Sequence, residues 1–127
     1  MGVADNNLQL KASGVCSTST AVVEGTAVDF GGPDKYPTVV RLNVTSTGVN
    51  TDTELIVTIE ECDTEDGRFV DAAVFEPITG NAGEGVYHIT HRFTKRYRRC
   101  TEQVSGDTAS TFTTQIDIVP QGRYNSF

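Results

Sequence analysis

The chain has 127 residues, of which 37% are hydrophobic and 21% charged, and its formal net charge is −7. This length predicts one domain with a single hydrophobic core. The acidic balance argues against non-specific binding to nucleic acid, and no apolar run approaches the roughly 20 residues that would span a bilayer. Threonine, serine, glycine and valine are plentiful and leucine is scarce, which favours strands and turns over helices.

Residues 1–14 are mostly polar, with one alternating patch at Leu8-Gln9-Leu10, so we expect an extended N-terminal arm. The segment has neither the basic start nor the long apolar stretch of a secretory signal. Three widely spaced cysteines, Cys16, Cys62 and Cys100, do not form the pattern of a secreted disulfide framework. We therefore expect synthesis in a reducing cytosol, while a bridge between one pair of these cysteines stays open.

The rest of the chain is a series of alternating or β-branched segments separated by turn signals, with no window of helical periodicity. In residues 38–47, Val40, Leu42 and Val44 share one face, and Pro120 is expected to end the last strand. The tail, residues 121–127, is expected to be mobile or docked on a neighbour. The strand candidates are residues 20–30, 38–47, 54–62, 68–76, 86–93, 96–105 and 111–119.

Seven or eight short strands predict an all-β fold, and a β-sandwich, a jelly roll and a barrel all fit the pattern. In residues 68–76, two apolar sets alternate with each other. Val70, Ala72 and Val74 form one set, opposite Phe69, Ala73 and Phe75.

His88 and His91 are the only histidines, and on a strand residues three apart point to opposite faces. Cys62 or Cys100 would join them only by long-range coincidence, and a cupin-like metal enzyme would need several histidines on facing strands. We therefore expect no metal site at these positions.

The segment Asp63-Thr64-Glu65-Asp66-Gly67 resembles the start of a calcium-binding loop. Counted from Asp63, however, the twelfth position is Val74, where such a loop requires glutamate. A solvated hairpin tip fits these residues better. The sequence also lacks a nucleophile elbow and a glycine-rich phosphate loop, so we expect neither an enzyme nor a cofactor.

Residues 92–99 hold five of the ten bases, interleaved with Phe93 and Tyr97, whereas residues 52–71 hold eight of the seventeen acids. One interpretation is a basic stripe that meets an acidic surface on another protein or on a second copy of the chain. The other is a solvated strand face neutralised by the acidic segment. The two interpretations are compatible.

Several short motifs follow one another along the chain in an order that suggests a family. Arg96-Tyr97-Arg98-Arg99-Cys100 leads through Val104-Ser105-Gly106 to Ser110-Thr111-Phe112-Thr113-Thr114. Upstream lie Val28-Asp29-Phe30-Gly31 and the segment 54–69 with its Asp66-Gly67 turn. In this order the motifs resemble the small jelly-roll cement (decoration) proteins of tailed-bacteriophage capsids, over residues 20–119.

The resemblance implies a jelly-roll β-sandwich of about eight antiparallel strands over residues 15–120. It also implies a virion protein, made in the host cytoplasm, that binds the outer capsid surface and stabilises contacts between major capsid subunits. Its partners would be the major capsid protein and its own copies, as a homodimer or homotrimer. We expect the arm, the basic segment and the tail to supply these contacts, through Leu8, Leu10, Arg92, Lys95, Arg96, Arg98, Arg99, Tyr124 and Phe127.

One strand departs from the family pattern. Family members alternate apolar residues along the R-Y-x-R-x strand, whereas here Arg98 and Glu102 share a face with Cys100 and Val104. Buried ions are costly unless they are paired. Either Arg98 and Glu102 pair across or along the sheet, or this strand lies at an oligomer interface.

A carbohydrate- or receptor-binding β-sandwich of a virion is the alternative function. Sugar sites favour exposed aromatic side chains, but the chain has no tryptophan and its four tyrosines are scattered.

Overall fold

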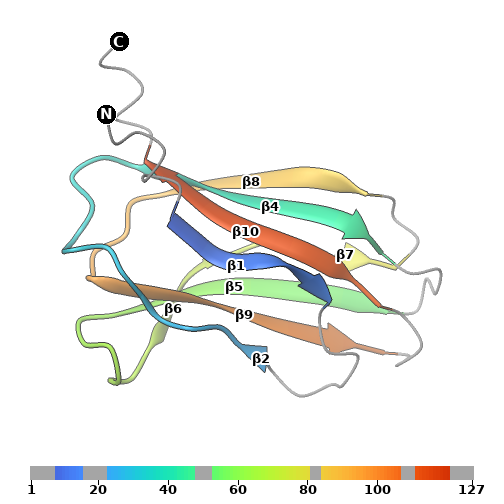
Figure 1. The fold of residues 1–127 in the computed structure, drawn as a ribbon, viewed down its shortest axis with the longest axis horizontal. Helices are drawn as coiled ribbons and strands as arrows, with labels where there is room; N and C mark the ends of the chain where they lie inside the picture. Colours follow the sequence, from blue (N-terminus) through green and yellow to red (C-terminus); the bar gives the residue numbers. More distant parts are fainter. Residues whose placement is uncertain (1–7, 16–22, 48–52, 81–83, 107–110, 121–127) are drawn as a thin grey trace, which may run out of the picture.

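The computed structural model describes residues 8–15, 23–47, 53–80, 84–106 and 111–120, which contain ten strands and no helix (Figure 1). The described part therefore offers no helical segment able to cross a bilayer. The strands are β1 (Leu8–Val15), β2 (Val23–Glu24), β3 (Val28–Asp29), β4 (Thr38–Ser46), β5 (Glu54–Cys62), β6 (Val70–Val74), β7 (Ile78–Thr79), β8 (Gly85–His91), β9 (Tyr97–Ser105) and β10 (Thr113–Pro120).

The strands form two antiparallel sheets that face each other as a sandwich (Figure 1). Sheet 1 has the order β1-β10-β4-β8, and sheet 2 has the order β2-β9-β5-β6, with β3 also on β9 and β7 also on β5. If β2 with β3, and β6 with β7, each count as one position, the chain has eight positions, arranged as 1-8-3-6 and 2-7-4-5. The antiparallel pairs 1/8, 2/7, 3/6 and 4/5 are nested, which is the topology of a jelly roll. The all-β jelly-roll prediction is confirmed.

The core lies between the sheets, because alternation along each central strand turns one apolar row inward. Leu42 on β4, Val57 and Ile59 on β5, and Ile116 on β10 are all 0% exposed. Burying side chains of this size stabilises the fold by about 1.5–3 kcal/mol each relative to exposure. On β6 the inward set is Ala73, followed by Phe75, while Val70 and Val74 face solvent.

The predicted strands over 38–47, 54–62 and 96–105 are confirmed to within one residue as β4, β5 and β9. The prediction of one continuous strand over 20–30 is wrong for its described part, which forms two short bridges to β9, β2 and β3. Gly25 separates them. Its N–H donates to the Cys100 carbonyl at 2.7 Å, and a Cβ there would lie only 3.0 Å from Cys100 Sγ.

The expected N-terminal arm differs from the structure in its second half. Residues 8–15 form β1, which pairs with β10 along one edge of sheet 1. Register shifts between Gln9 and Lys11 and between Lys11 and Gly14 interrupt the alternation, which is why the sequence pattern is short. Residues 1–7 and the tail 121–127 lie outside the described residues.

Candidate functional site

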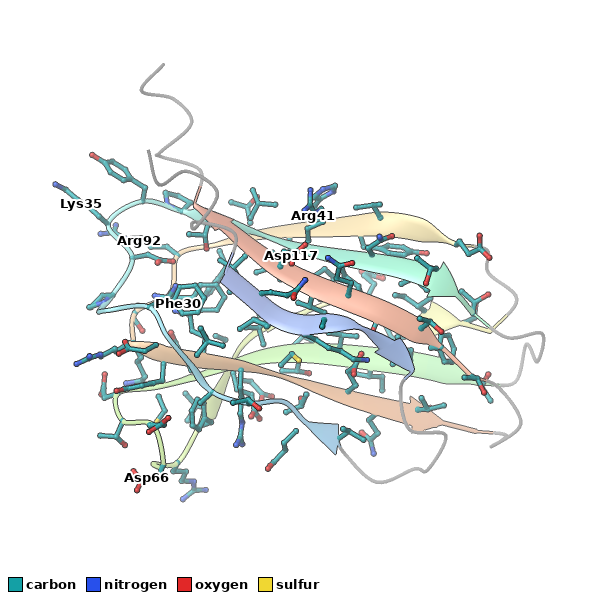
Figure 2. The ribbon with its side chains drawn as sticks, in the orientation of Figure 1. Phe30, Lys35, Arg41, Asp66, Arg92 and Asp117 are labelled. Atoms are coloured by element: carbon teal, nitrogen blue, oxygen red, sulfur yellow. The ribbon has the colours of Figure 1, made fainter. Side chains whose placement is uncertain are left out.

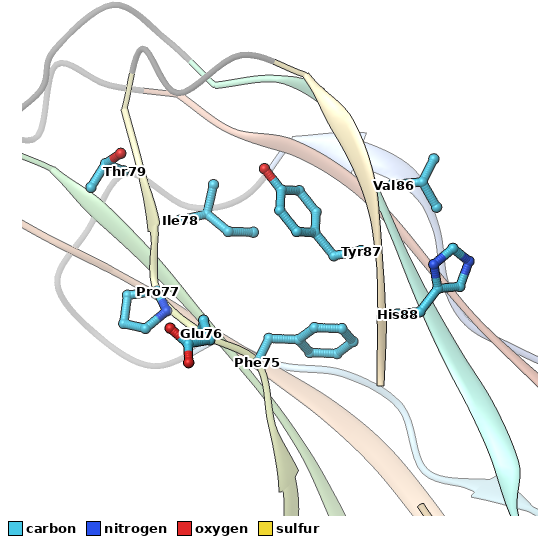
Figure 3. Close-up of a pocket in the computed structure, with 8 residues that line it drawn as sticks. All are labelled: Phe75, Glu76, Pro77, Ile78, Thr79, Val86, Tyr87 and His88. Atoms are coloured by element: carbon cyan, nitrogen blue, oxygen red, sulfur yellow. The ribbon is translucent and has the colours of Figure 1, made fainter. Parts of the chain in front are cut away.

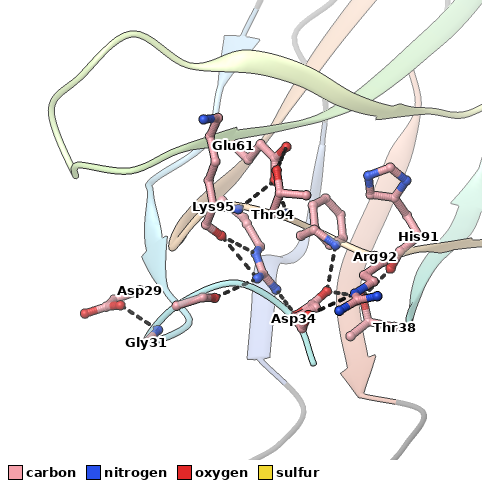
Figure 4. Close-up of polar contacts among 12 residues, drawn as sticks. Asp29, Gly31, Asp34, Thr38, Glu61, His91, Arg92, Thr94 and Lys95 are labelled. Carbon is pink, nitrogen blue, oxygen red and sulfur yellow. Dashed lines mark hydrogen bonds and ion pairs between the residues drawn. The ribbon is translucent and has the colours of Figure 1, made fainter. Parts of the chain in front are cut away.

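The basic segment 92–99 lies at one end of the sandwich, where the loop after β8 leads into β9 (Figure 1). Figure 4 shows the polar contacts made there. The loop 30–37, between β3 and β4, is joined to it by backbone bonds. Phe30 N–H donates to the Arg96 carbonyl at 2.9 Å, and Asp34 N–H donates to the Phe93 carbonyl at 2.8 Å. Segments more than fifty residues apart in the chain therefore build one surface.

Arg98 is buried at the centre of this end and is 0% exposed. Its Nη1 lies 2.9 Å from Asp34 Oδ1, and its Nη2 donates to the carbonyls of Gly32 and Lys95 at 3.1 and 3.2 Å. Burial lowers the pKa of Arg98, and the adjacent Asp34 opposes this effect. An arginine paired in this way stays charged inside the protein.

Two aromatic rings enclose the Arg98 guanidinium. Its central carbon lies 4.3 Å from the ring centre of Phe30 and 4.7 Å from that of Phe93. Such cation–π contacts gain strength when they are removed from water. Arg98 therefore serves the interior of the fold, and the prediction that it supplies an intermolecular contact does not fit its position.

Arg98 and Glu102 do not pair with each other along β9, but each has an ionic partner elsewhere in the chain, which for Arg98 is Asp34. Glu102, 4% exposed, has Lys11 of β1 as its ionic partner. The second explanation, an oligomer interface along this face, is not needed, because both charges have partners within the chain.

The half-buried carboxylate of Asp34 and the buried carboxylate of Glu61 hold the loop 92–96 in place. Asp34 Oδ2 accepts from the Phe93 N–H at 2.9 Å. Glu61, 6% exposed, accepts from the N–H groups of Thr94 and Lys95 at 2.9 and 3.1 Å (Figure 4). These bonds satisfy loop donors that β-sheet pairing leaves free, so the loop is positioned before any partner binds.

Arg96 and Asp29 form a two-pronged ion pair on the surface. Arg96 Nε and Nη2 donate to Asp29 Oδ1 and Oδ2, each at 2.7 Å, and the Gly31 N–H donates to Oδ1 at 2.8 Å. The bond from Arg96, then that from Gly31, lowers the pKa of Asp29 from 3.8 to about 2.

Arg99 and Lys95 are also paired within the chain. Arg99 Nε donates to Glu60 at 2.8 Å, its Nη2 donates to Glu24 at 3.2 Å, and its guanidinium lies 4.3 Å from the ring centre of Phe69. Lys95 Nζ lies 3.4 Å from an oxygen of Asp63. The neutralising acids thus come partly from residues 52–71, as one interpretation expected, and partly from residues 24–34, which the sequence did not single out.

Lys35, Tyr36 and Arg92, which we call the tip patch, remain exposed. Figure 2 shows Lys35 and Arg92 at this end of the sandwich. Tyr36 is 56% exposed, and the Lys35 amine lies 5.9 Å from its ring centre. Arg92 Nε donates to the Asp34 carbonyl at 3.2 Å, which brings it beside Lys35. Neither Lys35 nor Arg92 forms an ion pair with any residue that the structure describes. Arg92 was predicted as a contact residue from the sequence, whereas Lys35 and Tyr36 were not, since a turn between Pro33 and Pro37 carries no periodicity.

The other residues predicted to make contacts are Leu8, Leu10, Tyr124 and Phe127. Leu10 is 5% exposed and belongs to the core, so a contact role does not fit it either. Leu8 opens β1 opposite Ile118. Tyr124 and Phe127 lie outside the described residues, and the roles of Leu8, Tyr124 and Phe127 in contacts stay predictions.

His88 is exposed on β8, and the His91 ring packs edge-on against Phe93 with ring centres 4.7 Å apart. Across the described ranges, no three His, Cys, Asp or Glu side chains lie together as a metal site would require. The acids Glu65 and Asp66 are exposed on the hairpin between β5 and β6.

A cleft of about 500 Å³ opens between β7 and β8, the edge strands of the two sheets (Figure 3). Phe75, Ile78 and Tyr87 point into it, with Glu76 and Thr79 at its rim. Its floor is continuous with the core and largely apolar.

No protein-family model matches the chain, and no curated protein matches it. One similar solved structure is that of infectious bursal disease virus, Gx strain, with 9% identity and a TM-score of 0.47 over 91% of this chain and 31% of the other. Another is the xylanase Xyn10B of Clostridium thermocellum, its CBM22-1 and GH10 modules complexed with xylohexaose, with 13% identity and a TM-score of 0.45 over 89% of this chain and 28% of the other. The chain thus spans less than a third of either protein, and likeness at this level bears on neither function nor partners.

Proposed function

We propose that this chain is a capsid cement protein, a non-catalytic virion component that binds the outer surface of a phage head and holds neighbouring major capsid subunits together. The jelly-roll topology is the fold that the motif resemblance implies. The proposal also places its synthesis in the host cytoplasm and its final location on the virion surface.

The observation that carries the proposal is the convergence of the motifs. Val28 of the upstream motif lies directly opposite Arg98 of the R-Y-x-R-x strand, and Asp29 lies opposite Tyr97. On the other side of β9, Glu61, which belongs to the segment 54–69 with its Asp66-Gly67 turn, lies opposite Arg98. Motifs that are separated by more than thirty residues therefore meet on three adjoining strands, and their charged residues position the loops at the tip.

The tip patch is the surface we propose for capsid contact. Tyrosine and arginine are enriched at the centres of protein interfaces, and unpaired cations attract an acidic partner. A stable contact buries about 1,200–2,000 Å² in total, more than the tip patch alone, so additional copies or segments of the chain contribute. Repetition over a shell then multiplies modest contacts into avidity.

A binding experiment on capsids stripped of this protein tests the proposal. Purified protein is added back, and occupancy is counted by cryo-EM at low and at physiological salt. The variant Arg92→Glu is expected to lower occupancy, whereas Arg68→Glu, an equal charge change at another exposed cation without an ion pair in the described residues, is expected to bind normally. Absence of binding by the unaltered protein, or equal losses for both variants, contradicts the proposal.

The role of the N-terminal segment needs a deletion that spares β1. Removal of residues 2–7 leaves all of Leu8–Val15 in place, so a loss of occupancy reports a contact rather than a damaged sheet. Unchanged occupancy removes this segment from the contact surface.

A further inference from the structure

A second surface, on the outer face of sheet 1, carries polar side chains in a regular arrangement. Outward residues of three adjacent strands line a hollow of about 400 Å³ there, within the size range of small-ligand sites. The hollow lies away from the tip, and Figure 2 shows two of its residues, Arg41 and Asp117, on the neighbouring strands β4 and β10. Its lining is Arg41, Asn43, Val86, His88, Gln115 and Asp117.

The strand register arranges these six side chains as two rows of three. Asp117 lies opposite Arg41, which lies opposite His88. In the next outward row, Gln115 lies opposite Asn43, which lies opposite Val86. Strand spacing and the two-residue repeat give this grid a footprint of about 10 Å by 7 Å, the size of one or two sugar rings.

Asp117 supplies a nearly buried carboxylate to the grid. It points outward between the core residues Ile116 and Ile118, yet its side chain is only 7% exposed. Arg41 Nη2 donates to its Oδ2 at 3.1 Å, and Gln115 Nε2 lies 3.5 Å from the same oxygen. Within the described residues Oδ1 receives no hydrogen bond, so this carboxylate keeps a free acceptor atom in the hollow.

The other polar groups of the grid are unused. Neither the Asn43 amide nor the His88 ring has a hydrogen-bond partner among the residues that the structure describes. Val86, 51% exposed, adds an apolar surface beside them. The hollow therefore presents a carboxylate acceptor, a guanidinium donor, groups that both donate and accept, and one apolar side chain.

We propose that this hollow, the β4–β8–β10 grid, binds a neutral saccharide. Sugar hydroxyls donate and accept at once, as the grid requires, and the C–H edge of a sugar ring matches Val86. The Arg41–Asp117 ion pair leaves the grid without net charge, which favours a neutral sugar over a uronic acid or a sulfated one. The site would let a capsid-bound protein hold surface glycans, and it does not depend on the tip patch or on capsid binding.

The test is an NMR titration of the full chain with maltohexaose, cellohexaose, xylohexaose and mannohexaose, and with tetragalacturonate as the acidic comparison. We expect at least one neutral oligosaccharide to bind at concentrations below about 10 mM. The shifted amides are expected to cluster on β4, β8 and β10 around the six grid residues.

Variants separate recognition from folding. Asn43→Ala and His88→Ala are each expected to weaken binding at least about fivefold, because each removes a hydrogen-bonding group worth about 1 kcal/mol. Thr45→Ala changes the next outward position of β4, outside the hollow, and is expected to leave affinity unchanged. Shifts confined to tetragalacturonate, shifts elsewhere on the protein, or no shift with any neutral sugar each overturn the proposal.

Discussion

Lys11 and Glu102 form an ion pair between the two sheets, with Lys11 Nζ 2.8 Å from Glu102 Oε1. Lys11 lies on β1 of sheet 1 and Glu102 on β9 of sheet 2. Thr114 of β10 completes the contact, since it accepts from Lys11 Nζ at 2.8 Å and donates to Glu102 Oε2. One buried carboxylate therefore ties the N-terminal strand to the opposite sheet.

Replacing Lys11 with methionine should weaken the attachment of β1 to sheet 2. Glu102 would be left as a buried charge without its cation, so we expect the free energy of unfolding to fall by about 3 kcal/mol in urea denaturation. The double variant Lys11→Met with Glu102→Met removes both charges and should recover most of the loss. Hydrogen exchange of residues 8–15 should rise in the single variant only, and a fully protected β1 there would contradict this account.

Arg98→Met should destabilise the tip more than any surface change. It leaves Asp34 without its cation and removes the stack between Phe30 and Phe93, for an expected loss of about 3–5 kcal/mol. Arg98→Lys keeps the charge but not the planar group, so its loss should be intermediate. Arg68→Met, at an exposed position, should stay within about 0.5 kcal/mol, and equal losses for Arg98→Met and Arg68→Met would refute the structural role of Arg98.

The Asp29–Arg96 pair predicts a specific acid response. Because the pKa of Asp29 is lowered from 3.8 to about 2, the folded state binds fewer protons than the unfolded state between these values. Its contribution to stability is complete above about pH 4 and is lost as the pH falls through about 2. An NMR titration of the Asp29 carboxyl carbon should show this midpoint, and Arg96→Gln should move it back towards 3.8. A midpoint that Arg96→Gln leaves unchanged would contradict the assigned cause.

Cys62 and Cys100 are both buried, 8% and 2% exposed. In a Cys16→Ser variant, which removes the cysteine outside the described residues, a thiol reagent should therefore label neither remaining residue in the native protein. Both should react in urea, with the same midpoint as unfolding. Rapid labelling without denaturant would show that β5 or β9 opens locally.

Alternation was sufficient to predict the central strands, because β4 and β5 have one face in the core and one towards solvent. Leu42 and Ile59 are buried where period two places them. β1 was missed as a strand because its register shifts break that period after Leu10. The division between β2 and β3 depends on how closely Gly25 approaches Cys100, a contact between residues 75 positions apart that no local pattern contains.

The candidate functional site was harder to predict from the sequence than the strands, because it depends even more on contacts between distant residues. The sequence identified the basic segment but not its partners, since Asp29 on β3 and Asp34 in the loop after it belong to a different part of the chain. Arg98 was predicted to supply an intermolecular contact, yet its pairing with Asp34 makes it an interior residue. The β4–β8–β10 grid had no sequence signal, because its six residues come from three strands and are brought together only by the strand register.

The order of the strands has a consequence for how the protein forms during synthesis. The two strands that complete the sheets, β9 and β10, are the last of the ten to leave the ribosome. Until then, among the described strands, β1, β2 and β3 lack the neighbours with which they pair, and only the pairs β4–β8, β5–β6 and β5–β7 can assemble. The nascent chain therefore keeps open sheet edges, and the sandwich closes in a late step that follows the synthesis of β9 and β10.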